Sequence, residues 1–287
     1  MEIKITKMQG CGNDFVIIDY DEYQRGLKSH MWKDMANAAV KLCDRNFGIG
    51  ADGLIIPNLH TEDADIGWFF YNSDGTTAQM CGNGIRCFAK YVFDKKLVDK
   101  KEFTVKTLAG IITPKIMRDG HVRVNMAKPI LEPEKIPFIP NNNFNYKISV
   151  KNQIFEGNAI SMGNPHFVIF IEEDEDLLSL AREYGPIIET SAEFPEKTNV
   201  EFIKICSSKK IELRVWERGC GITLACGTGA CASVVAGILN GYIKNSVDVE
   251  LLGGTVHIDW NGSKNNTDED VFMTGPAEYV FNAEIAS

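Results

Sequence analysis

The sequence predicts a mixed α/β chain that is built as two similar lobes. Cys81-Gly82-Asn83-Gly84 and Cys226-Gly227-Thr228-Gly229 each place a thiol ahead of a glycine-rich opening and a helix-forming segment. Gly12-Asn13-Asp14-Phe15-Val16-Ile17 is echoed by Gly163-Asn164-Pro165-His166-Phe167-Val168-Ile169, and in both copies the asparagine precedes the cysteine by a similar distance. Two copies with so long a period indicate an ancient duplication and not a solenoid, whose repeats are much shorter.

The composition is that of a globular protein and excludes several classes. The chain has 287 residues, a length sufficient for two domains with a core each. Apolar residues make up 44% of it and charged residues 24%, as is usual for globular proteins. A net charge of −9 argues against nucleic acid or an anionic membrane as a partner. No apolar run approaches the roughly 18 residues that span a bilayer. The start of the chain lacks the apolar core of a signal peptide, so we expect a cytoplasmic protein.

In the expected first lobe, a strand precedes two helices. Met1-Glu2-Ile3-Lys4-Ile5 alternates polar and apolar residues, as a half-buried strand does. Ser29 has the side chain of an N-cap, and apolar residues from Trp32 to Cys43 recur at helical spacing. A second helix is expected over Phe88–Leu97, after the first cysteine motif.

In the expected second lobe, loops, strands and a helix start can be located. Glu132–Asn145 is rich in proline and asparagine and indicates an exposed loop. The acidic run Glu172–Asp176 indicates a solvated helix start. Alternation in Ile211–Trp216 and Thr255–Trp260 predicts two half-buried strands.

Both cysteine motifs are placed where a helix start favours acid/base chemistry. Glycine leaves backbone N–H groups uncovered, so such a helix start can hold an anion. It also lowers the pKa of a neighbouring thiol from about 8.5 toward working pH. Ala232–Asn240 is apolar on all sides and ends at Gly241, which predicts a buried helix with Cys226 at the floor of a cleft. We therefore predict that Cys81 and Cys226 act together on one negatively charged substrate.

Other uses of the eight cysteines are less well supported. The chain is too large and too rich in core residues to need a disulfide framework. Five residues separate Cys81 from Cys87 and four separate Cys226 from Cys231, and no Cys-x-x-Cys pair exists. This argues against a zinc site and against a thiol–disulfide redox enzyme, so we expect no metal. A cysteine phosphatase needs an arginine about six positions after its nucleophile. Cys87 stands at that position after Cys81, which argues against this class of enzyme.

A set of motifs occurs in a fixed order along the chain. Asn72-Ser73-Asp74-Gly75 precedes Met80–Cys87, and Glu217-Arg218-Gly219 precedes Leu224–Ala230. Further members of the set are Gly12–Phe15, Gly48–Gly53, Met162–His166 and Thr198–Val200. From about Met8 to Pro276 the chain resembles the diaminopimelate epimerase family. A Cys-Gly-x-Gly motif alone would be weak support, but the ordered set is specific.

The resemblance implies an α+β fold of two pseudosymmetric lobes, each a mostly antiparallel β-sheet or barrel wrapped around a central helix. It assigns residues 1–126 and 277–287 to an N-terminal lobe with Cys81, residues 127–276 to a C-terminal lobe with Cys226, and the active site to the cleft between them. It implies an isomerase that interconverts LL- and meso-2,6-diaminopimelate for lysine and peptidoglycan-precursor biosynthesis. It implies no cofactor, pyridoxal phosphate included, and a homodimer.

The resemblance also implies roles for individual residues. Cys81 would deprotonate the LL isomer and Cys226 would reprotonate it, with the roles exchanged in reverse. Helix-start amides would stabilise the enediolate. Glu217 would pair with the reacting ammonium, and Arg218 can bind the distal carboxylate with two hydrogen bonds. The implied substrate-binding residues are Asn13, Asn72, Gly82, Asn83, Asn164, Asn199, Glu217, Arg218, Gly227 and Thr228.

Two departures from the family pattern and one alternative activity bear on these roles. Gly53 stands where many members have glutamine, and Ile222 replaces a common glutamate near the second cysteine. A racemase of the same fold that acts on proline or hydroxyproline is the nearest alternative, although Arg218 favours a substrate with a second charged end. His166 is open to two interpretations, a contact to the site and a hydrogen-bonded structural residue, whereas Asp74 is expected to stabilise a turn.

Overall fold

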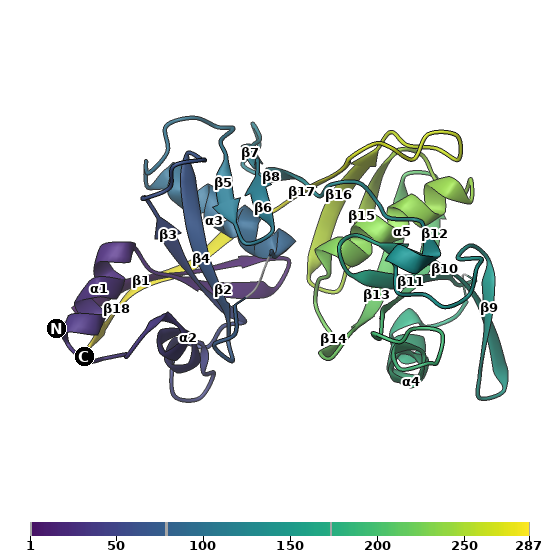
Figure 1. Cartoon of the computed structure of the whole chain (residues 1–287), viewed down its shortest axis with the longest axis horizontal. Helices are drawn as coiled ribbons and strands as arrows, with labels where there is room; N and C mark the ends of the chain where they lie inside the picture. The colour runs from purple at the N-terminus through teal and green to yellow at the C-terminus, as the bar shows by residue number, and fades with distance from the viewer. Residues whose placement is uncertain (1, 78–79, 173, 287) are drawn as a thin grey trace. The chain divides into compact units, whose positions relative to one another are not determined.

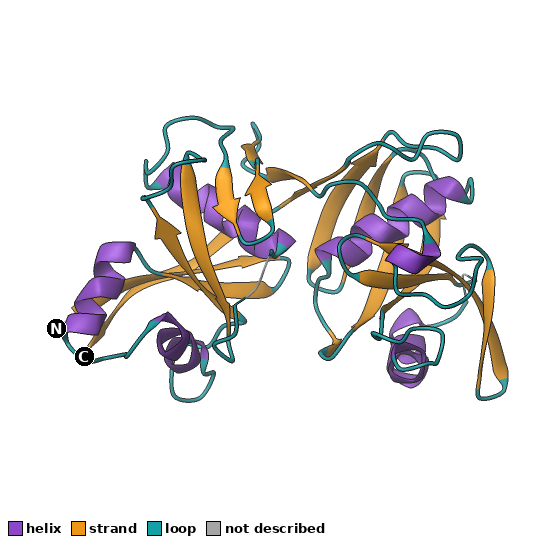
Figure 2. Ribbon diagram, viewed as in Figure 1, coloured by secondary structure: helices purple, strands orange, loops and turns teal. Residues whose placement is uncertain are grey.

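The chain folds into two compact units. The computed structural model describes residues 2–77, 80–172 and 174–286. One unit comprises Met1–Val124 and Gly275–Ser287, and the other comprises Asn125–Thr274. Each contains a β-sheet with helices packed on it (Figures 1 and 2). Among the described residues, none of the helices combines the length and the apolar character that crossing a membrane requires.

The first unit is organised around a sheet with the strand order β18-β1-β2-β3-β4-β5-β6. Its strands are β1 (Glu2–Gly10), β2 (Asn13–Ile17), β3 (Gly53–Asn58), β4 (Ile66–Asn72), β5 (Val105–Thr107), β6 (Gly110–Ile112) and β18 (Glu278–Ala286). Its helices are α1 (Tyr20–Lys28), α2 (Met35–Cys43) and α3 (Gly82–Asp94). A short ribbon of β7 (Lys115–Ile116) and β8 (Val122–Asn125) follows β6.

The second unit is organised around a sheet with the strand order β17-β16-β15-β13-β12-β11-β10-β9, and β14 pairs with β13. Its strands are β9 (Tyr146–Val150), β10 (Gln153–Ser161), β11 (Pro165–Phe170), β12 (Asn199–Ser207), β13 (Lys210–Glu217), β14 (Gly221–Ile222), β15 (Ser246–Leu251), β16 (Gly254–Trp260) and β17 (Val271–Gly275). Its helices are η1 (Pro133–Lys135), α4 (Leu177–Glu189) and α5 (Gly227–Leu239).

The two units repeat one order of strand pairings. In the first, β1–β2 is antiparallel, β2–β3 parallel, β3–β4 antiparallel, β4–β5 parallel and β5–β6 antiparallel. In the second, the same order runs from β10 through β11, β12, β13 and β15 to β16. Helices α3 and α5 occupy the same place in this order, since each leads into the second parallel pairing. The duplication and the α+β fold predicted from the sequence are therefore confirmed.

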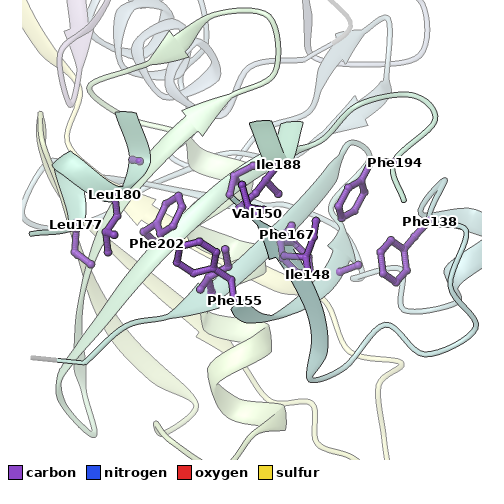
Figure 3. Packing of buried hydrophobic residues seen from close by; sticks show 14 of the residues in the cluster. Phe138, Ile148, Val150, Phe155, Phe167, Leu177, Leu180, Ile188, Phe194 and Phe202 are labelled. Atoms are coloured by element: carbon purple, nitrogen blue, oxygen red, sulfur yellow. The ribbon is translucent and has the colours of Figure 1, made fainter. Parts of the chain in front are cut away.

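The sheet of the second unit is covered on both faces. Helix α5 contacts β10, β11 and β12 and also β16 at the other end of that run of strands, so the sheet curves around it. Residues on successive strand positions face opposite sides. Val200 and Phe202 therefore pack in the core cluster under α4 (Figure 3), whereas Glu201 lies against α5. One strand thus supplies both a core face and a polar face beside the second cysteine.

The first unit has the same two-sided arrangement. Helices α1 and α2 cover a core cluster that includes Ile3, Val16 and Leu54 from three neighbouring strands. Helix α3 contacts β1, β2 and β3. The last strand, β18, pairs with β1 over almost its whole length (Figure 1, yellow beside purple).

Two expectations about local structure are wrong. Ser29 caps the C-terminus of α1 and does not begin a helix; α2 begins later, after Asp34, whose carboxylate accepts from Asn37 N–H at 2.8 Å. The chain reverses between them with His30 at φ +60°, and Trp32 is buried in the connection. Glu132–Asn145 is also not a purely exposed loop.

That segment carries core residues of the second unit. Ile136 and Phe138 are buried in the cluster of Figure 3, and Asn143 donates to the backbone oxygens of Leu131 and Ala159. Apart from the short helix η1, this segment is irregular, as its proline and asparagine content indicated, but that composition did not prevent burial.

Candidate active site

Each of the two predicted catalytic cysteines is the N-cap of a buried helix. Cys81 precedes α3 and Cys226 precedes α5, both with extended backbone. Cys81 Sγ accepts from Gly84 N–H at 3.4 Å, and Cys226 Sγ accepts from Gly229 N–H at 3.3 Å. The thiol thus takes the place that a serine or aspartate side chain usually holds at a helix start. The helices therefore begin inside the glycine motifs, earlier than the sequence predicted.

The first turns of these helices hold four of the predicted binding residues. Gly82 and Asn83 open α3, and Gly227 and Thr228 open α5. Backbone N–H groups in a first turn have no acceptor within the helix and carry the positive end of its dipole. Each first turn is therefore a place where a carboxylate can be bound by backbone donors.

In the first unit, Asn13 joins the cysteine to the helix start. Its Oδ1 lies 3.5 Å from Cys81 Sγ and accepts from Asn83 Nδ2 at 3.1 Å. Its Nδ2 donates to Asp52 Oδ2 at 2.5 Å. The structure thus brings together Asn13, Cys81 and Asn83 as the sequence predicted, and adds Asp52.

Asn72 stands at the end of β4, beside the same segment. Its Nδ2 donates to Thr76 Oγ1 at 3.0 Å, and the following Ser73 N–H donates to the Asp52 oxygen at 3.0 Å. Asp74 accepts from Thr76 N–H at 2.9 Å and stabilises this turn, as expected. No hydrogen bond is recorded between Asn72 and the Cys81 cluster in the described part of the chain.

Position 53 has no room for the glutamine that the family pattern suggested. A Cβ on Gly53 would lie 2.7 Å from Phe70 Cε2 and 2.8 Å from the Tyr71 oxygen. Contacts that short displace the neighbouring strand β4. Glycine is therefore part of how β3 and β4 pack in this chain.

In the second unit, burial dominates the chemistry of Cys226. Its relative exposure is 5%, and burial, with the charges of Glu217 and Glu201, raises the pKa of the Cys226 thiol well above its usual range. The hydrogen bonds from Thr228 and the Gly229 N–H act in the opposite direction but are outweighed. The sequence predicted both a buried helix and a lowered pKa of the Cys226 thiol; the pKa prediction is wrong because desolvation and two neighbouring carboxylates outweigh the helix start. These surroundings therefore favour the thiol form of Cys226 over the thiolate.

Glu217 lies next to this thiol and is also shifted. Burial raises its pKa, while a hydrogen bond from Thr223 Oγ1 lowers it. Ile222, the second departure from the family pattern, packs against the core cluster of this unit. Ile222 thus contributes an apolar contact, and Thr223 supplies the polar contact to Glu217.

His166 forms a buried hydrogen-bonded chain with two neighbours. Its Nδ1 lies 2.6 Å from Glu201 Oε1, and its Nε2 lies 3.1 Å from Asn164 Oδ1. His166 and Glu201 are fully buried, and burial raises the pKa of Glu201. Both ring nitrogens have a partner, and one partner is the predicted binding residue Asn164.

Asn199 and Arg218 are joined through the backbone. Asn199 Oδ1 accepts from Arg218 N–H at 2.9 Å, and its Nδ2 donates to the Pro165 oxygen at 2.8 Å. The Arg218 side chain is exposed and donates through Nη1 to the Glu196 oxygen at 2.9 Å. Asn199 thus holds the turn that carries Arg218, which leaves other guanidinium donors available.

One group of side chains has the composition of a metal site. Ligand atoms of His166, Glu201 and Cys226 lie within 4.8 Å of one another, and all three residues are buried. A metal ion there would compete with the hydrogen bonds of His166 described above. The donor set can hold zinc in principle, but its geometry is that of an imidazole–carboxylate pair beside a thiol.

Two residues of these clusters were not predicted. Asp52 lies within a recognised motif, but sequence alone did not show that it contacts Asn13. Glu201 follows Asn199 by two positions, so strand periodicity places both on one face of β12. That alternation was a signal that could have identified Glu201.

Comparison with known proteins gives a consistent result. A family model described as diaminopimelate epimerase matches residues 5–132 and 158–280. A diaminopimelate epimerase of Carboxydothermus hydrogenoformans is 47% identical over 287 residues, covering 98% of this chain and 99% of its own. One of Halothermothrix orenii is 45% identical over 295 residues, covering 99% and 98%.

Solved structures of lower identity share the fold. A probable proline racemase from Agrobacterium radiobacter aligns with a TM-score of 0.68 at 14% identity, covering 99% of this chain and 93% of its own. A hydroxyproline epimerase from Agrobacterium vitis aligns with a TM-score of 0.67 at 11% identity, covering 99% and 92%. At these identities the likeness concerns the fold alone.

Proposed function

Because the chain belongs to the diaminopimelate epimerase family, we propose that it interconverts LL- and meso-2,6-diaminopimelate, a step of lysine and peptidoglycan-precursor biosynthesis. The reaction inverts one α-carbon, so a proton leaves one face and another arrives on the opposite face. Cys81 and Cys226 are the two groups that carry these protons, without pyridoxal phosphate or another cofactor.

The repeated N-cap cysteine is the observation that carries the mechanism. Each copy of the duplicated fold places a thiol at the start of a buried helix, with first-turn amides beside it. In the LL-to-meso direction, Cys81 thiolate takes the α-proton and becomes a thiol. Cys226 gives its proton to the other face and becomes the thiolate. The raised pKa of Cys226 supports its role as the donor in this direction.

The α-carboxylate needs stabilisation while the α-carbon carries negative charge. First-turn amides of Gly82, Asn83, Gly227 and Thr228 provide donors for the enediolate oxygens. Removing one such donor costs about 3–4 kcal/mol of transition-state stabilisation in enzymes of this kind. The helix dipoles act in the same direction.

The remaining predicted residues bind the substrate's charged ends. Glu217 with Asn13 accepts from the ammonium at the reacting carbon, and Arg218 binds the distal carboxylate. Asn72, Asn164 and Asn199 complete the set that recognises the distal amino-acid end. The exposed guanidinium of Arg218 supports this assignment, because Asn199 holds the Arg218 backbone and the one hydrogen bond from Nη1 to the Glu196 oxygen leaves further donors for a carboxylate.

The wider setting of the enzyme belongs to the same proposal. It is cytoplasmic and homodimeric, with lobes at residues 1–126 with 277–287 and at 127–276, and with the active site in the cleft between them. Nucleic acid is not a partner, which the net charge of −9 supports.

Solvent-deuterium incorporation tests the activity directly. The protein is incubated in D2O with LL- or meso-diaminopimelate and no added cofactor, and each isomer is followed by proton NMR and mass spectrometry. We expect one deuterium at the α-carbon and interconversion of the isomers. Proline, hydroxyproline and histidine, offered separately, are expected to remain unlabelled.

Single Cys81→Ser and Cys226→Ser variants provide the control for the mechanism. Each is expected to lose roughly 10²–10⁴-fold in epimerisation, the usual contribution of a positioned acid or base. Cys206→Ser, at an exposed cysteine, is expected to leave the rate unchanged. Absence of deuterium from both isomers would refute the activity, whereas full activity in either active-site variant would refute the two-thiol mechanism alone.

A further inference from the structure

The Asn13 side chain links a carboxylate to Cys81. Its Nδ2 donates to Asp52 Oδ2 at 2.5 Å, and its Oδ1 lies 3.5 Å from Cys81 Sγ. The same Oδ1 accepts from Asn83 Nδ2 at 3.1 Å. Because an ionised carboxylate only accepts hydrogen bonds, the end of the amide that faces Asp52 must be the N–H₂ group. The carbonyl end therefore faces the cysteine.

Asp52 is itself held in place by groups remote from Cys81. Its Oδ2 accepts from Asp14 N–H at 3.2 Å, and its Oδ1 accepts from Arg45 Nη2 at 2.9 Å. Its own N–H donates to the Asp14 backbone oxygen at 2.9 Å. These contacts fix the carboxylate although 45% of its side chain is exposed. The orientation of the Asn13 side chain is thus set by Asp52, directly before β3, and not by the cysteine.

We propose that Asp52 is a positioning residue that keeps the carbonyl oxygen of Asn13, and not its N–H₂ group, directed at Cys81. A carbonyl oxygen accepts from a thiol or from an ammonium, whereas it repels a thiolate. Asp52 therefore favours the thiol form of Cys81 in the free protein. When the substrate ammonium takes the Asn13 oxygen, the thiol loses its proton to solvent water, and the thiolate that remains is the base of the proposed LL-to-meso reaction. The part played by the substrate rests on the proposed function.

Other charged groups surround this cluster and must be separated from Asp52 in any test. Within the described residues they come from β1, the β1–β2 turn, β2, the segment between α2 and β3, and α3. They are the charged residues Lys7, Asp14, Arg45 and Arg86 and the titratable thiols Cys11 and Cys87. Asp52 itself makes the hydrogen bond to the Asn13 side chain.

The first test measures how Cys81 alkylation depends on pH in the free protein. Asp52→Asn allows the Asn13 amide to turn over and present N–H₂ to the sulfur, which stabilises the thiolate. We expect the pH of half-maximal iodoacetamide labelling at Cys81, read by peptide mass spectrometry, to fall by about 1 unit. The exposed Cys206 in the same samples is the internal reference. No substrate is needed for this measurement.

A double-mutant cycle separates orientation from simple charge removal. If Asp52 acts through Asn13, Asp52→Asn shifts the labelling profile in the native background and not in an Asn13→Ala background. If it acts only through its charge, the shift is the same in both backgrounds. Arg45→Gln, which removes the ion pairs but keeps the Asn13–Asp52 hydrogen bond, is expected to leave the profile in place.

Kinetics provides the second readout. Asp52→Asn is expected to raise KM for diaminopimelate roughly 10- to 100-fold, with a smaller change in kcat, because the ammonium meets a donor in place of an acceptor. Asp52→Ala serves as a second variant, and thermal unfolding checks that each variant is folded. An unchanged profile, an equal shift in both backgrounds, or an equal shift with Arg45→Gln would overturn the proposal. An inactive native protein would instead refute the proposed function and leave the labelling test intact.

Discussion

At Cys226 two influences on a thiol oppose each other. The helix start offers a backbone donor, Gly229 N–H, and this favours the thiolate. Burial and the carboxylates of Glu217 and Glu201 favour the thiol, and together they prevail. These surroundings thus suit Cys226 to donate a proton. For Cys226 to act as a base in the reverse direction, the burial or the nearby negative charges must change.

Glu217→Gln is expected to make Cys226 easier to ionise. The amide removes a negative charge that opposes the thiolate, so the pH of half-maximal alkylation at Cys226 falls by about 1 unit. The sign follows from the raised pKa of the native thiol: removing a cause of the rise moves the midpoint down. Peptide mass spectrometry across a pH series measures it.

Glu212→Gln is the matched control, because Glu212 lies on the same strand and pairs with Arg214. It is expected to leave the Cys226 midpoint unchanged. A midpoint that rises in Glu217→Gln, or that falls equally in both variants, would contradict the assignment of Glu217 as a neighbour that opposes the thiolate.

Helix α5 shows how an element adapts its composition to burial. It is buried along most of its length and therefore carries small and branched apolar residues. Glycine stands where neighbouring atoms come closest to the helix backbone. A Cβ at Gly229 would lie 2.7 Å from Glu201 Oε1, and one at Gly237 would lie 2.5 Å from Ile243 Cδ1. These glycines serve close packing and not backbone flexibility.

Gly237→Ala is expected to destabilise the protein despite the better helix propensity of alanine. The propensity gain is at most about 1 kcal/mol, whereas overpacking costs about 1–3 kcal/mol. Urea unfolding is expected to show a lower midpoint with an unchanged slope. The clash involves the side chain of Ile243, which lies beyond the end of the helix.

An Ile243→Ala background provides the control for this packing argument. Once Ile243 is shortened to alanine, the methyl group that Gly237→Ala adds no longer clashes with the Ile243 side chain. Its effect on the free energy of unfolding therefore becomes neutral or stabilising relative to Ile243→Ala alone. If Gly237→Ala is equally destabilising in both backgrounds, the contact with Ile243 is not the cause.

At the scale of the whole protein, the C-terminal segment of the chain returns to the unit in which the chain begins. The last strand, β18, pairs with β1 from Glu2 to Gln9, and Thr6 Oγ1 donates to Asn282 Oδ1 at 2.8 Å. Arg86, fully buried in α3, donates to the Pro276 oxygen at 3.1 Å. The second unit is thereby inserted between two segments that form one sheet.

Removing residues 277–287 is expected to weaken the first unit selectively. Strand β1 loses its hydrogen-bonded neighbour and becomes an exposed edge. Hydrogen exchange measured by mass spectrometry is expected to quicken at least about tenfold across β1, while β15 and β16 of the second unit keep their protection. Equal loss of protection in both units would show that they unfold as one and would contradict this expectation.

Periodicity and short motifs determined a large part of this protein in advance. The alternation of Ile211–Trp216 and Thr255–Trp260 predicted β13 and β16, and the duplicated Cys-Gly-x-Gly motif predicted two helix starts in two similar units. These predictions succeeded because they rest on local geometry, which neighbouring residues specify. Family membership followed from the order of the motifs.

Contacts between distant segments were decided only by the tertiary structure. The pairing of Asp52 with Asn13, the burial that reverses the expected pKa of Cys226, and the lack of space at Gly53 all depend on side chains far away in sequence. The connection after Ser29 departs from its helical pattern because Trp32 packs into the core. Composition and spacing specify which groups are present and how each segment prefers to fold, but desolvation and hydrogen-bond partners arise only when strands and helices pack together.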